Sequence, residues 1–337
     1  MDNIIVADIC KKYGIKVDSV SDVIDTSHGK TDLRYNFIIN NKYVLKMNSA
    51  GSVSEAFLQG INRLVMRYRK IGVWCPQILE TENGQLISEW DLSKEKFKCY
   101  IEEYAPYQIA EEVEFYTFKE EMLEHIGKLA VQYTYVDLVE HKSMWSLIDL
   151  SPYDNEIDEK QENLDMLIEV LKNHDYVKEA ENLMKLNNIS RSHIRAHFEL
   201  LPRCVYQGDL NPSNLLMDEQ KHFVGLIDFN MYGTEVNINC FLNESMYYFR
   251  KEDFEELCAK DIFSKMNQIQ GRLLNVIFRN YILNDIEKKV FEDYKRVVDM
   301  SFYPNVMLLI ELIQNRKYVD KVIQLINLIC EIKHEEI

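Results

Sequence analysis

Residues 207–230 read QGDLNPSNLLMDEQKHFVGLIDFN, and this stretch decides what fold the rest of the chain is expected to have. Gly208 and Pro212 favour a fixed, non-helical loop, because glycine tolerates unusual backbone angles and proline cannot donate a backbone hydrogen bond. Two short apolar runs follow, Leu215–Met217 and Phe223–Ile227, with polar turn residues between them. Apolar runs separated in this way predict a β-hairpin.

Three polar side chains are expected to meet around this hairpin. Asn214 and Asp228 flank its two strands and so lie at its open end, and Asp209 precedes Asn214 by five residues across the same loop. Phosphoryl transfer to a hydroxyl needs such a set, because the reaction depends on positioning and charge neutralisation. We expect Asp209 to orient the hydroxyl and accept its proton, and the oxygens of Asn214 and Asp228 to hold Mg²⁺. In the alternative interpretation these residues only cap turns.

The pattern of apolar residues changes near Ala105–Pro106, from one typical of strands to one typical of helices. Apolar and β-branched runs before it predict a sheet of about five strands, with one helix between the third and fourth. Beyond about residue 112 the chain is expected to be mostly helical, with an interruption at 203–232. We therefore predict an α+β fold with an N-lobe, 1–105, and a larger helical C-lobe, 106–337. The expected strands in the N-lobe are Val20–Ser27, Tyr35–Ile39, Tyr43–Met47, Gln77–Leu79, Leu86–Ser88 and Lys98–Glu103, and the expected helices are Ser54–Lys70, Thr117–Tyr135, Leu164–Leu171, Val177–Leu186, Ser190–Leu200 and several within 251–335.

The composition narrows the class of protein. The chain has 337 residues, 47% of them hydrophobic, which is enough for two lobes with sizeable cores. Its apolar runs are too short to span a bilayer, and the N-terminus lacks the apolar core of a secretory signal. The seven cysteines are scattered, as expected of reduced thiols in a cytoplasmic protein. A net charge of −16 argues against nucleic acid and membranes as partners.

This charge is unevenly distributed along the sequence. Residues 1–100 hold 14 Lys/Arg and 12 Asp/Glu, whereas residues 101–337 hold 25 and 43. The acidic second part could attract a cationic substrate. The simpler interpretation, a solvated surface that keeps the protein soluble, remains open.

The segment around Asp209 resembles the catalytic segment of the aminoglycoside phosphotransferase and choline kinase superfamily, whose members have a protein-kinase-like fold. The usual motif is H-G-D-x-x-x-x-N with a downstream I-D-[FW], and Gln207 stands here in place of the His. The resemblance extends over residues 20–240 and implies a small-molecule kinase with ATP or GTP as phosphate donor. The positions that match the motif are Gly208, Asp209, Asn214, Ile227, Asp228 and Phe229.

The resemblance also implies a nucleotide site in the N-lobe. Lys46, in the expected third strand, would bind the α- and β-phosphates. Glu55 is the only carboxylate between residues 47 and 79 and so the candidate partner of Lys46, although a charge at a helix N-terminus explains it equally well. A phosphate-covering loop is expected at Ser27 and Gly29, and backbone groups near Glu102 and Tyr104 are expected to bond the adenine.

Three functions are compatible with these features. The first is an O-phosphotransferase that uses ATP or GTP and Mg²⁺ to modify a small molecule, for example a cationic one such as an aminoglycoside, amino sugar or amino alcohol. The second is a weakly active or inert scaffold protein of the same fold, such as a spore-coat component, which Gln207 and the glycine-poor loop would favour. A protein kinase comes last, because the H-R-D and A-P-E elements are absent from the sequence. The acceptor and the oligomeric state, monomer or dimer, are not specified by the sequence.

Overall fold

The structure is a computed structural model that describes residues 3–49, 53–92, 95–152, 154 and 156–331. The chain forms two compact units, the first made of Met1–Phe118 and Asp209–Asn230 and the second of Lys119–Gly208 and Met231–Ile337. The position expected for a lobe boundary, between residues 105 and 106, lies inside the first unit. The reason is that Gln108–Ile109 (β6) pairs with Leu215–Met217 (β8), which joins the chain after the sheet to the hairpin that follows Asp209.

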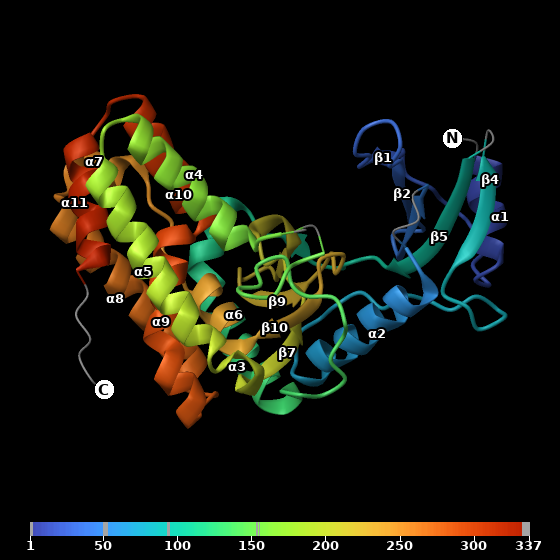
Figure 1. The fold of residues 1–337 in the computed structure, drawn as a ribbon. Helices are drawn as coiled ribbons and strands as arrows, with labels where there is room; N and C mark the ends of the chain where they lie inside the picture. Colours follow the sequence, from blue (N-terminus) through green and yellow to red (C-terminus); the bar gives the residue numbers. More distant parts are fainter. Residues whose placement is uncertain (1–2, 50–52, 93–94, 153, 155, 332–337) are drawn as a thin grey trace. The chain divides into compact units, whose positions relative to one another are not determined.

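The first unit contains a five-stranded antiparallel sheet, as the sequence predicts (Figure 1). Its hairpin turn places Asn40 and Asn41 at φ 53° and 52°, the left-handed angles that asparagine tolerates and that a tight hairpin requires. Two expected strands are wrong, because Gln77–Leu79 contributes only an isolated bridge at Ile78 and Leu86–Ser88 is replaced by a strand that begins at Ser88. In sheet order, the strands are Ile24–Asp25 (β1), Arg34–Ile39 (β2), Tyr43–Asn48 (β3), Glu95–Glu103 (β5) and Ser88–Leu92 (β4).

Two helices accompany this sheet. Asn3–Lys11 (α1), which the sequence reasoning did not anticipate, packs its apolar residues against the sheet and completes a buried core. Glu55–Lys70 (α2) follows β3 as predicted and begins after Ser54, whose side chain accepts a hydrogen bond from Phe57 N at 3.2 Å. This N-cap explains why the helix starts at Glu55. The core on the α1 side of the sheet includes Val6, Ile9, Cys10, Phe37, Ile39, Leu45, Met47, Phe97 and Ile101.

The predicted hairpin is present as β8 and Phe223–Leu226 (β9), which form a three-stranded sheet with β6. The segment around Trp74 runs parallel to β9, because Trp74 N donates to Val224 O at 2.8 Å and Leu226 N donates to Trp74 O at 2.9 Å. Gly225 makes this approach possible, since a Cβ there would lie 2.4 Å from Trp74 O. The hairpin is therefore anchored to the chain that follows α2.

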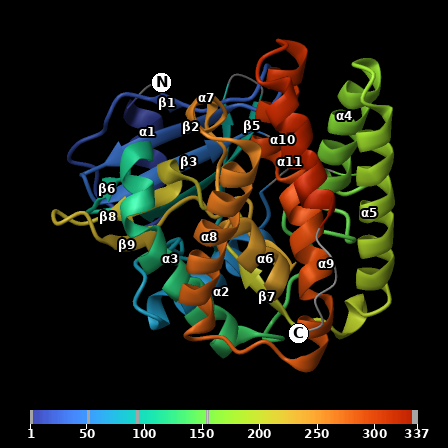
Figure 2. The same ribbon diagram turned by 90° about the vertical axis from the view of Figure 1, so that its left-hand side faces the viewer.

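The second unit is mostly helical, and Arg203–Tyr206 (β7) pairs antiparallel with Gly233–Val236 (β10) inside it. Its helices α4 and α5 lie side by side in Figures 1 and 2. The sequence predicts a break after residue 186, but α5 continues, because Asn187 bonds Gln161 and Arg191 through its side chain and leaves the helix backbone intact. The helices are Glu112–Tyr133 (α3, which crosses the unit boundary), Glu159–Asn173 (α4), Val177–Arg195 (α5), Asn237–Glu244 (α6), Lys251–Glu256 (α7), Ala259–Phe278 (α8), Asp285–Ser301 (α9), Tyr303–Gln314 (α10) and Val319–Cys330 (α11).

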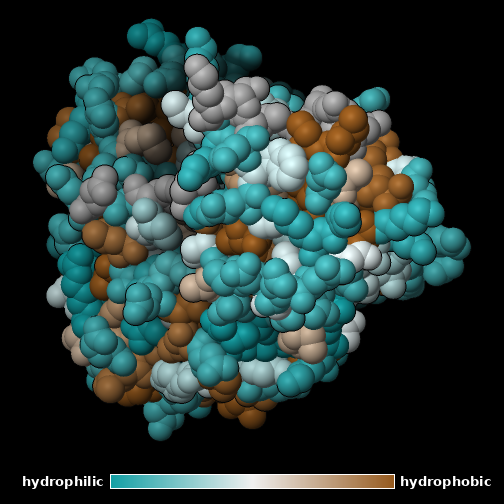
Figure 3. Space-filling view, turned by 90° about the vertical axis from the view of Figure 1, so that its right-hand side faces the viewer, coloured by the Kyte–Doolittle hydropathy of each residue, from teal (hydrophilic) through white to brown (hydrophobic). Residues whose placement is uncertain are grey.

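The surface and the cysteines have the character expected from the charged residues and the scattered thiols in the sequence. Polar residues cover much of the face in Figure 3, with apolar residues scattered between them. All seven cysteines are free thiols, and five of them are buried. Within the described ranges no single helix is long and apolar enough to cross a membrane, and α9 with α10 pass that test only as a pair bent by 44°.

Candidate active site

The loop that carries Asp209 starts from a backbone position that only glycine can occupy. Gly208 has φ +85°, in the left-handed region, and a Cβ at this residue would lie 2.1 Å from Met231 O. Both the angle and the contact exclude a larger residue. Strand β7 ends at Tyr206, so this glycine turns the chain sharply just before Asp209.

Two asparagines hold the Asp209 carboxylate. Asn211 Nδ2 donates to Asp209 Oδ1 at 2.7 Å, and Asn214 Nδ2 donates to Asp209 Oδ2 at 2.8 Å and to its carbonyl oxygen at 3.0 Å. Asn211 is fixed in turn, because its Oδ1 accepts from Ser213 N at 3.1 Å at the start of the short 3-10 helix Pro212–Asn214 (η2). Each carboxylate oxygen of Asp209 therefore accepts a hydrogen bond from a positioned amide.

The surroundings of Asp209 shift its protonation in a defined direction. Burial raises the pKa of the Asp209 carboxyl above its ordinary value, and the negative charge of Asp228 raises it further. The hydrogen bonds from Asn211 and Asn214 lower this pKa, but they do not cancel the effect of burial. A raised pKa makes a carboxylate a stronger proton acceptor, which suits a general base.

Asn214 and Asp228 meet at the open end of the hairpin, as the sequence predicts. Ile227 N donates to Asn214 O at 2.9 Å, which fixes the residue before Asp228 against Asn214. Asp228 itself has φ +54°, a left-handed conformation that ends β9 and redirects the chain. The hairpin thus fixes the backbone of Asn214 beside Ile227, the residue that precedes Asp228.

The Asn214 side chain fits a role in binding a divalent cation. Its Nδ2 faces Asp209, and no donor in the described part of the chain hydrogen-bonds its Oδ1, the atom that Mg²⁺ would bind. The described residues contain no group of three or more His, Cys, Asp or Glu side chains suited to a metal ion. Asn214 and Asp228 carry oxygen atoms of the kind that Mg²⁺ prefers, and Mg²⁺ sites in proteins are often completed by water and substrate phosphate.

Lys46 is half-buried on β3, as expected, but its partner is different from the one that was predicted. Lys46 Nζ lies 2.8 Å from Glu102 Oε1 on β5, and both side chains are less than one-fifth exposed. Glu55 instead accepts hydrogen bonds from the backbone N–H groups of Leu86 and Ile87 at 2.7 and 3.2 Å. The expected Lys46–Glu55 pair is not formed, because Glu55 occupies the first turn of α2 and fixes the chain before β4.

The charge on Lys46 is stabilised by several neighbours. Burial acts to lower the pKa of the Lys46 ammonium, but Glu102, Tyr100 and Asp228 raise it well above the ordinary value. The influence of Asp228 connects Lys46 on the five-stranded sheet with the hairpin that carries Asn214. Lys46 therefore remains a cation whose charge interacts with that of Asp228.

The predicted phosphate-covering loop is a tight turn between β1 and β2. Ser27 uses its hydroxyl inside this turn, since it donates to Asp25 Oδ1 at 2.5 Å and accepts from Arg34 N at 2.9 Å. Gly29 has φ +71°, and a Cβ there would meet no atom within 4 Å. The glycine is thus required by the turn, while the space beside it stays open.

The backbone around the expected adenine site is already largely hydrogen-bonded. Glu102 pairs with Val44 across β5 and β3, and its side chain, rather than its backbone, makes the notable contact with Lys46. Tyr104 N donates to Lys42 O at 2.8 Å, so this N–H is engaged in the structure. A role of Glu102 and Tyr104 in binding adenine therefore stays a prediction.

The model of the phosphotransferase enzyme family matches residues 24–235, more than half of the chain. The chain belongs to the phosphotransferase enzyme family. No curated protein matches its sequence. Membership of this family makes the protein a phosphotransferase that acts on small molecules, a small-molecule kinase, in agreement with the resemblance seen in the Asp209 segment.

Solved structures agree on the fold of this phosphotransferase. An aminoglycoside phosphotransferase candidate from Ralstonia eutropha JMP134 is 11% identical, with a TM-score of 0.51 over 98% of this chain and 96% of that one. The amicoumacin kinase hAmiN, in complex with AMP-PNP, Ca²⁺ and Ami, is 12% identical, with a TM-score of 0.50 over 98% of this chain and 94% of that one. At identities this low, the similarity establishes a common α+β, kinase-like fold, but not a common substrate.

Sequence reasoning missed one residue of the site and expected a different contact for another. Asn211 was treated only as part of a loop, although its place two residues after Asp209 and before a proline is typical of a side chain that bonds nearby backbone. Glu102 was expected to act through its backbone. Its pairing with Lys46 follows from the register of β3 and β5, in which Lys46 lies opposite Tyr100, two residues from Glu102 on the same face.

Proposed function

We propose that this phosphotransferase transfers the γ-phosphate of ATP or GTP to a hydroxyl group of a small molecule. Asp209 orients the acceptor hydroxyl and takes its proton, Asn214 and Asp228 hold Mg²⁺, and Lys46 binds the α- and β-phosphates. When bound, Mg²⁺ neutralises phosphate charge in the transition state.

The observation that carries this proposal is the arrangement of the amide of Asn214. It donates to the Asp209 carboxylate on one side and leaves Oδ1 without a donor on the other, while Ile227 N fixes its backbone next to Asp228. One side chain thus links the proposed base to the proposed metal ligands. A turn-capping role alone would not require Asn214 Oδ1 to be left without a donor.

The pairing of Lys46 with Glu102 supports a nucleotide-binding role for this lysine. A charged group that is mostly removed from water needs a partner, and the ion pair holds the ammonium in one orientation. Ser27 and Gly29 are proposed to approach the phosphates through the open side of their turn. Glu55 has a place in this proposal only as a residue that orders α2.

The acceptor is the least determined part of the proposed reaction. The excess of acidic residues after position 100 favours an acceptor with a positive charge, such as an aminoglycoside, amino sugar or amino alcohol. A solvated acidic surface explains the same excess. The net charge therefore supports a cationic group on the acceptor without naming the molecule.

The experiment that tests the proposal separates nucleotide binding from transfer. Thermal shift with Mg²⁺ and ATP or GTP is expected to show stabilisation of the wild type and of Asp209→Ala, and weaker stabilisation of Lys46→Met. Phosphate transfer to a panel of hydroxylated acceptors should be lost in Asp209→Ala and retained in Glu219→Gln, an exposed change on the same hairpin. A wild-type protein that neither binds nucleotide nor transfers phosphate would favour the scaffold function.

A further inference from the structure

Two histidines lie one helical turn apart at the end of α5, inside the second unit. His193 belongs to α5, and His197 follows the residue that caps this helix, Ala196. Their ring centroids are 5.2 Å apart, and the ring planes are inclined by 89°. Side chains four residues apart lie on one face of a helix, which explains why the two imidazoles meet. The residues assigned to phosphate transfer do not include either histidine.

The ring of His193 is oriented by a buried carboxylate. Its Nδ1 lies 2.5 Å from Oδ2 of Asp293 on α9. Asp293 is 4% exposed, whereas the His193 side chain is 42% exposed. An ionised carboxylate can only accept a hydrogen bond, so the hydrogen in this contact belongs to Nδ1 of the histidine. In the neutral ring the other nitrogen, Nε2, then carries the lone pair.

The ring of His197 is oriented by the backbone of α5. Its Nδ1 lies 3.0 Å from His193 O. A carbonyl oxygen also only accepts, so Nδ1 again carries the hydrogen and Nε2 the lone pair. No described residue hydrogen-bonds the Nε2 atom of either ring. The two contacts therefore leave the same nitrogen of both rings available as a ligand.

This combination of contacts is typical of histidines that bind metal ions. A ligating histidine almost always donates its other N–H to a carboxylate or to a backbone carbonyl, which fixes its tautomer and its orientation. Asp293 supplies the first kind of acceptor, and His193 O supplies the second. A purely structural ion pair between His193 and Asp293 would explain the orientation of one ring only.

The spacing of the two rings also fits one shared ion. Zn²⁺ lies about 2.0–2.1 Å from an imidazole nitrogen, and therefore about 3.2 Å from the centre of the ring. With a tetrahedral angle at the ion, the centres of two such rings would be about 5.2 Å apart. The observed separation of the His193 and His197 centroids is 5.2 Å. The separation of the rings is thus already the one that a shared ion requires.

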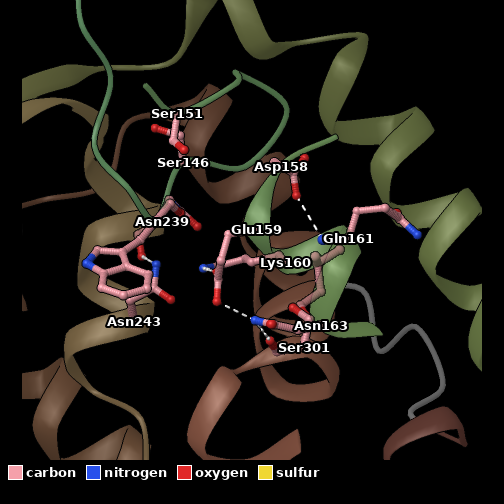
Figure 4. A network of polar contacts seen from close by, with 12 residues as sticks. Ser146, Ser151, Asp158, Glu159, Lys160, Gln161, Asn163, Asn239, Asn243 and Ser301 are labelled. Carbon is pink, nitrogen blue, oxygen red and sulfur yellow. Dashed lines mark hydrogen bonds and ion pairs between the residues drawn. The ribbon is translucent and has the colours of Figure 1, made fainter. Parts of the chain in front are cut away.

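The part of α5 that carries His193 is held in place by the start of α4. Arg191 donates from Nη1 and Nη2 to the two carboxylate oxygens of Asp158 at 2.6 and 2.7 Å, and both side chains are buried. Asp158 also accepts from Gln161 N at 3.0 Å at the beginning of α4 (Figure 4). Asn187, one turn before Arg191, donates to Gln161 Oε1 at 2.8 Å. Ligands on a helix that is already fixed lose little freedom when they bind an ion.

We propose that His193 and His197 bind a divalent transition-metal ion of the Zn²⁺ class through their Nε2 atoms. Imidazole nitrogen suits Zn²⁺, Cu²⁺ and Ni²⁺, whereas Mg²⁺ prefers oxygen, so these ligands differ in kind from Asn214 and Asp228. The described residues contain no group of three or more His, Cys, Asp or Glu side chains around an ion, so water completes the coordination. The binding of this ion does not depend on the proposed phosphate transfer.

The bound ion strengthens the contact between two helices of the second unit. His193 links α5 to Asp293 on α9, and Asp293 also lies 3.5 Å from Arg296 Nη1 on that helix. His197 comes from the turn between α5 and the short 3-10 helix Phe198–Leu200 (η1). An ion that bridges the two rings therefore fixes the end of α5 against α9. Because the unfolded chain does not hold the two rings together, the ion stabilises the folded state.

Isothermal titration of the full chain with Zn²⁺, and separately with Ni²⁺, tests this site directly. The wild type is expected to bind one more ion per chain than His197→Ala, or to bind it with a Kd at least about tenfold lower. His197→Ala removes one ligand and keeps the contact between His193 and Asp293. His174→Ala, at the C-terminal cap of α4, is the matched control and should bind the ion like the wild type.

A second variant tests the role of the buried carboxylate. Asp293→Asn keeps an oxygen that can accept from His193 Nδ1 but removes its negative charge. Loss of a charged partner of this kind is expected to weaken Zn²⁺ binding by about tenfold or more. Circular dichroism without metal shows whether the variant is folded, and stabilisation by Mg²⁺ and ATP should stay as in the wild type.

Thermal unfolding gives an independent measure of the same site. Zn²⁺ in excess should raise the midpoint of unfolding of the wild type and of His174→Ala by at least about 2 °C, and that of His197→Ala by less. Zn²⁺ bound by free thiols, such as the exposed Cys258, would affect all three proteins equally. The same stoichiometry, Kd and Zn²⁺-dependent stabilisation in wild type and His197→Ala would overturn the proposal. Absence of phosphate transfer in the wild type would overturn the proposed function and leave the metal site unaffected.

Discussion

Replacing Glu235 by Gln should stabilise the protein in neutral and alkaline solution and leave its stability at low pH almost unchanged. Burial raises the pKa of the Glu235 carboxyl from 4.5 to about 7, although Lys160 on α4 and the hydrogen bond from Val236 N act to lower it. Burial raises the pKa of the Tyr294 hydroxyl on α9, and the negative charge of Glu235 raises it further. Above neutral pH the folded protein therefore holds a buried carboxylate that the unfolded chain would expose to water.

The size of the effect follows from the two pKa values. Between about pH 4.5 and pH 7 the folded state binds a proton at Glu235 that the unfolded state has already lost, so the free energy of unfolding falls as the pH rises through this window. A shift of this size corresponds to roughly 3 kcal/mol at about 1.4 kcal/mol per unit. Gln keeps a carbonyl acceptor for Val236 N and has no proton to lose, so the variant should not show this part of the decline.

Urea unfolding followed by tryptophan fluorescence at pH 5, 6, 7 and 8 measures this difference. The free energy of unfolding of Glu235→Gln minus that of wild type should grow by about 2 to 3 kcal/mol between pH 5 and pH 8. Glu181→Gln, an exposed change on α5, should follow the wild type at every pH. A difference for Glu235→Gln that does not change with pH, or that becomes smaller as the pH rises, would refute the reasoning.

Further predictions concern the Asp209 loop. Gly208→Ala should destabilise the protein by at least about 2 kcal/mol in urea unfolding, because alanine is strained at φ +85° and its Cβ would collide with Met231 O, whereas Gly271→Ala, in an open position on α8, should be neutral or stabilising by up to about 1 kcal/mol. The acid limb of kcat/KM should lie above the ordinary aspartate pKa of about 3.9, since the pKa of Asp209 is raised and transfer requires its deprotonated form. Asn211→Ala should move this limb to still higher pH, because it removes a hydrogen bond that lowers the pKa, and a limb that stays in place would contradict that role.

The sequence was most informative where local chemistry determines the structure. The two strands of the hairpin after Asp209 and the positive φ angles at Asn40 and Asn41 follow from residues close to one another in the chain, and the structure has both. The meeting of Asn214 and Asp228 follows from the same hairpin geometry. Such short-range features can be predicted because the residues that determine them are neighbours in the chain.

Features that depend on packing between distant segments were not predictable in the same way. Helix α1 gains its stability from burial against the sheet, and its nine residues would be marginal alone. Lys46 pairs with Glu102 and not with Glu55 because the register of β3 and β5 places Glu102 near it, and the sequence does not specify this register. Lys160 and Glu235 are far apart in the sequence, and no local pattern indicates that both side chains would be buried.

The proposed reaction depends most directly on Asp209 as the group that accepts the hydroxyl proton. Phosphorus NMR of a reaction with Mg²⁺, ATP and any acceptor that the wild type phosphorylates can follow the new phosphate ester and ADP together. The Asp209→Ala protein is predicted to bind Mg²⁺ and ATP like the wild type and to form ester at least about a hundredfold more slowly. Ester formation by this variant at a rate close to that of the wild type would contradict the account.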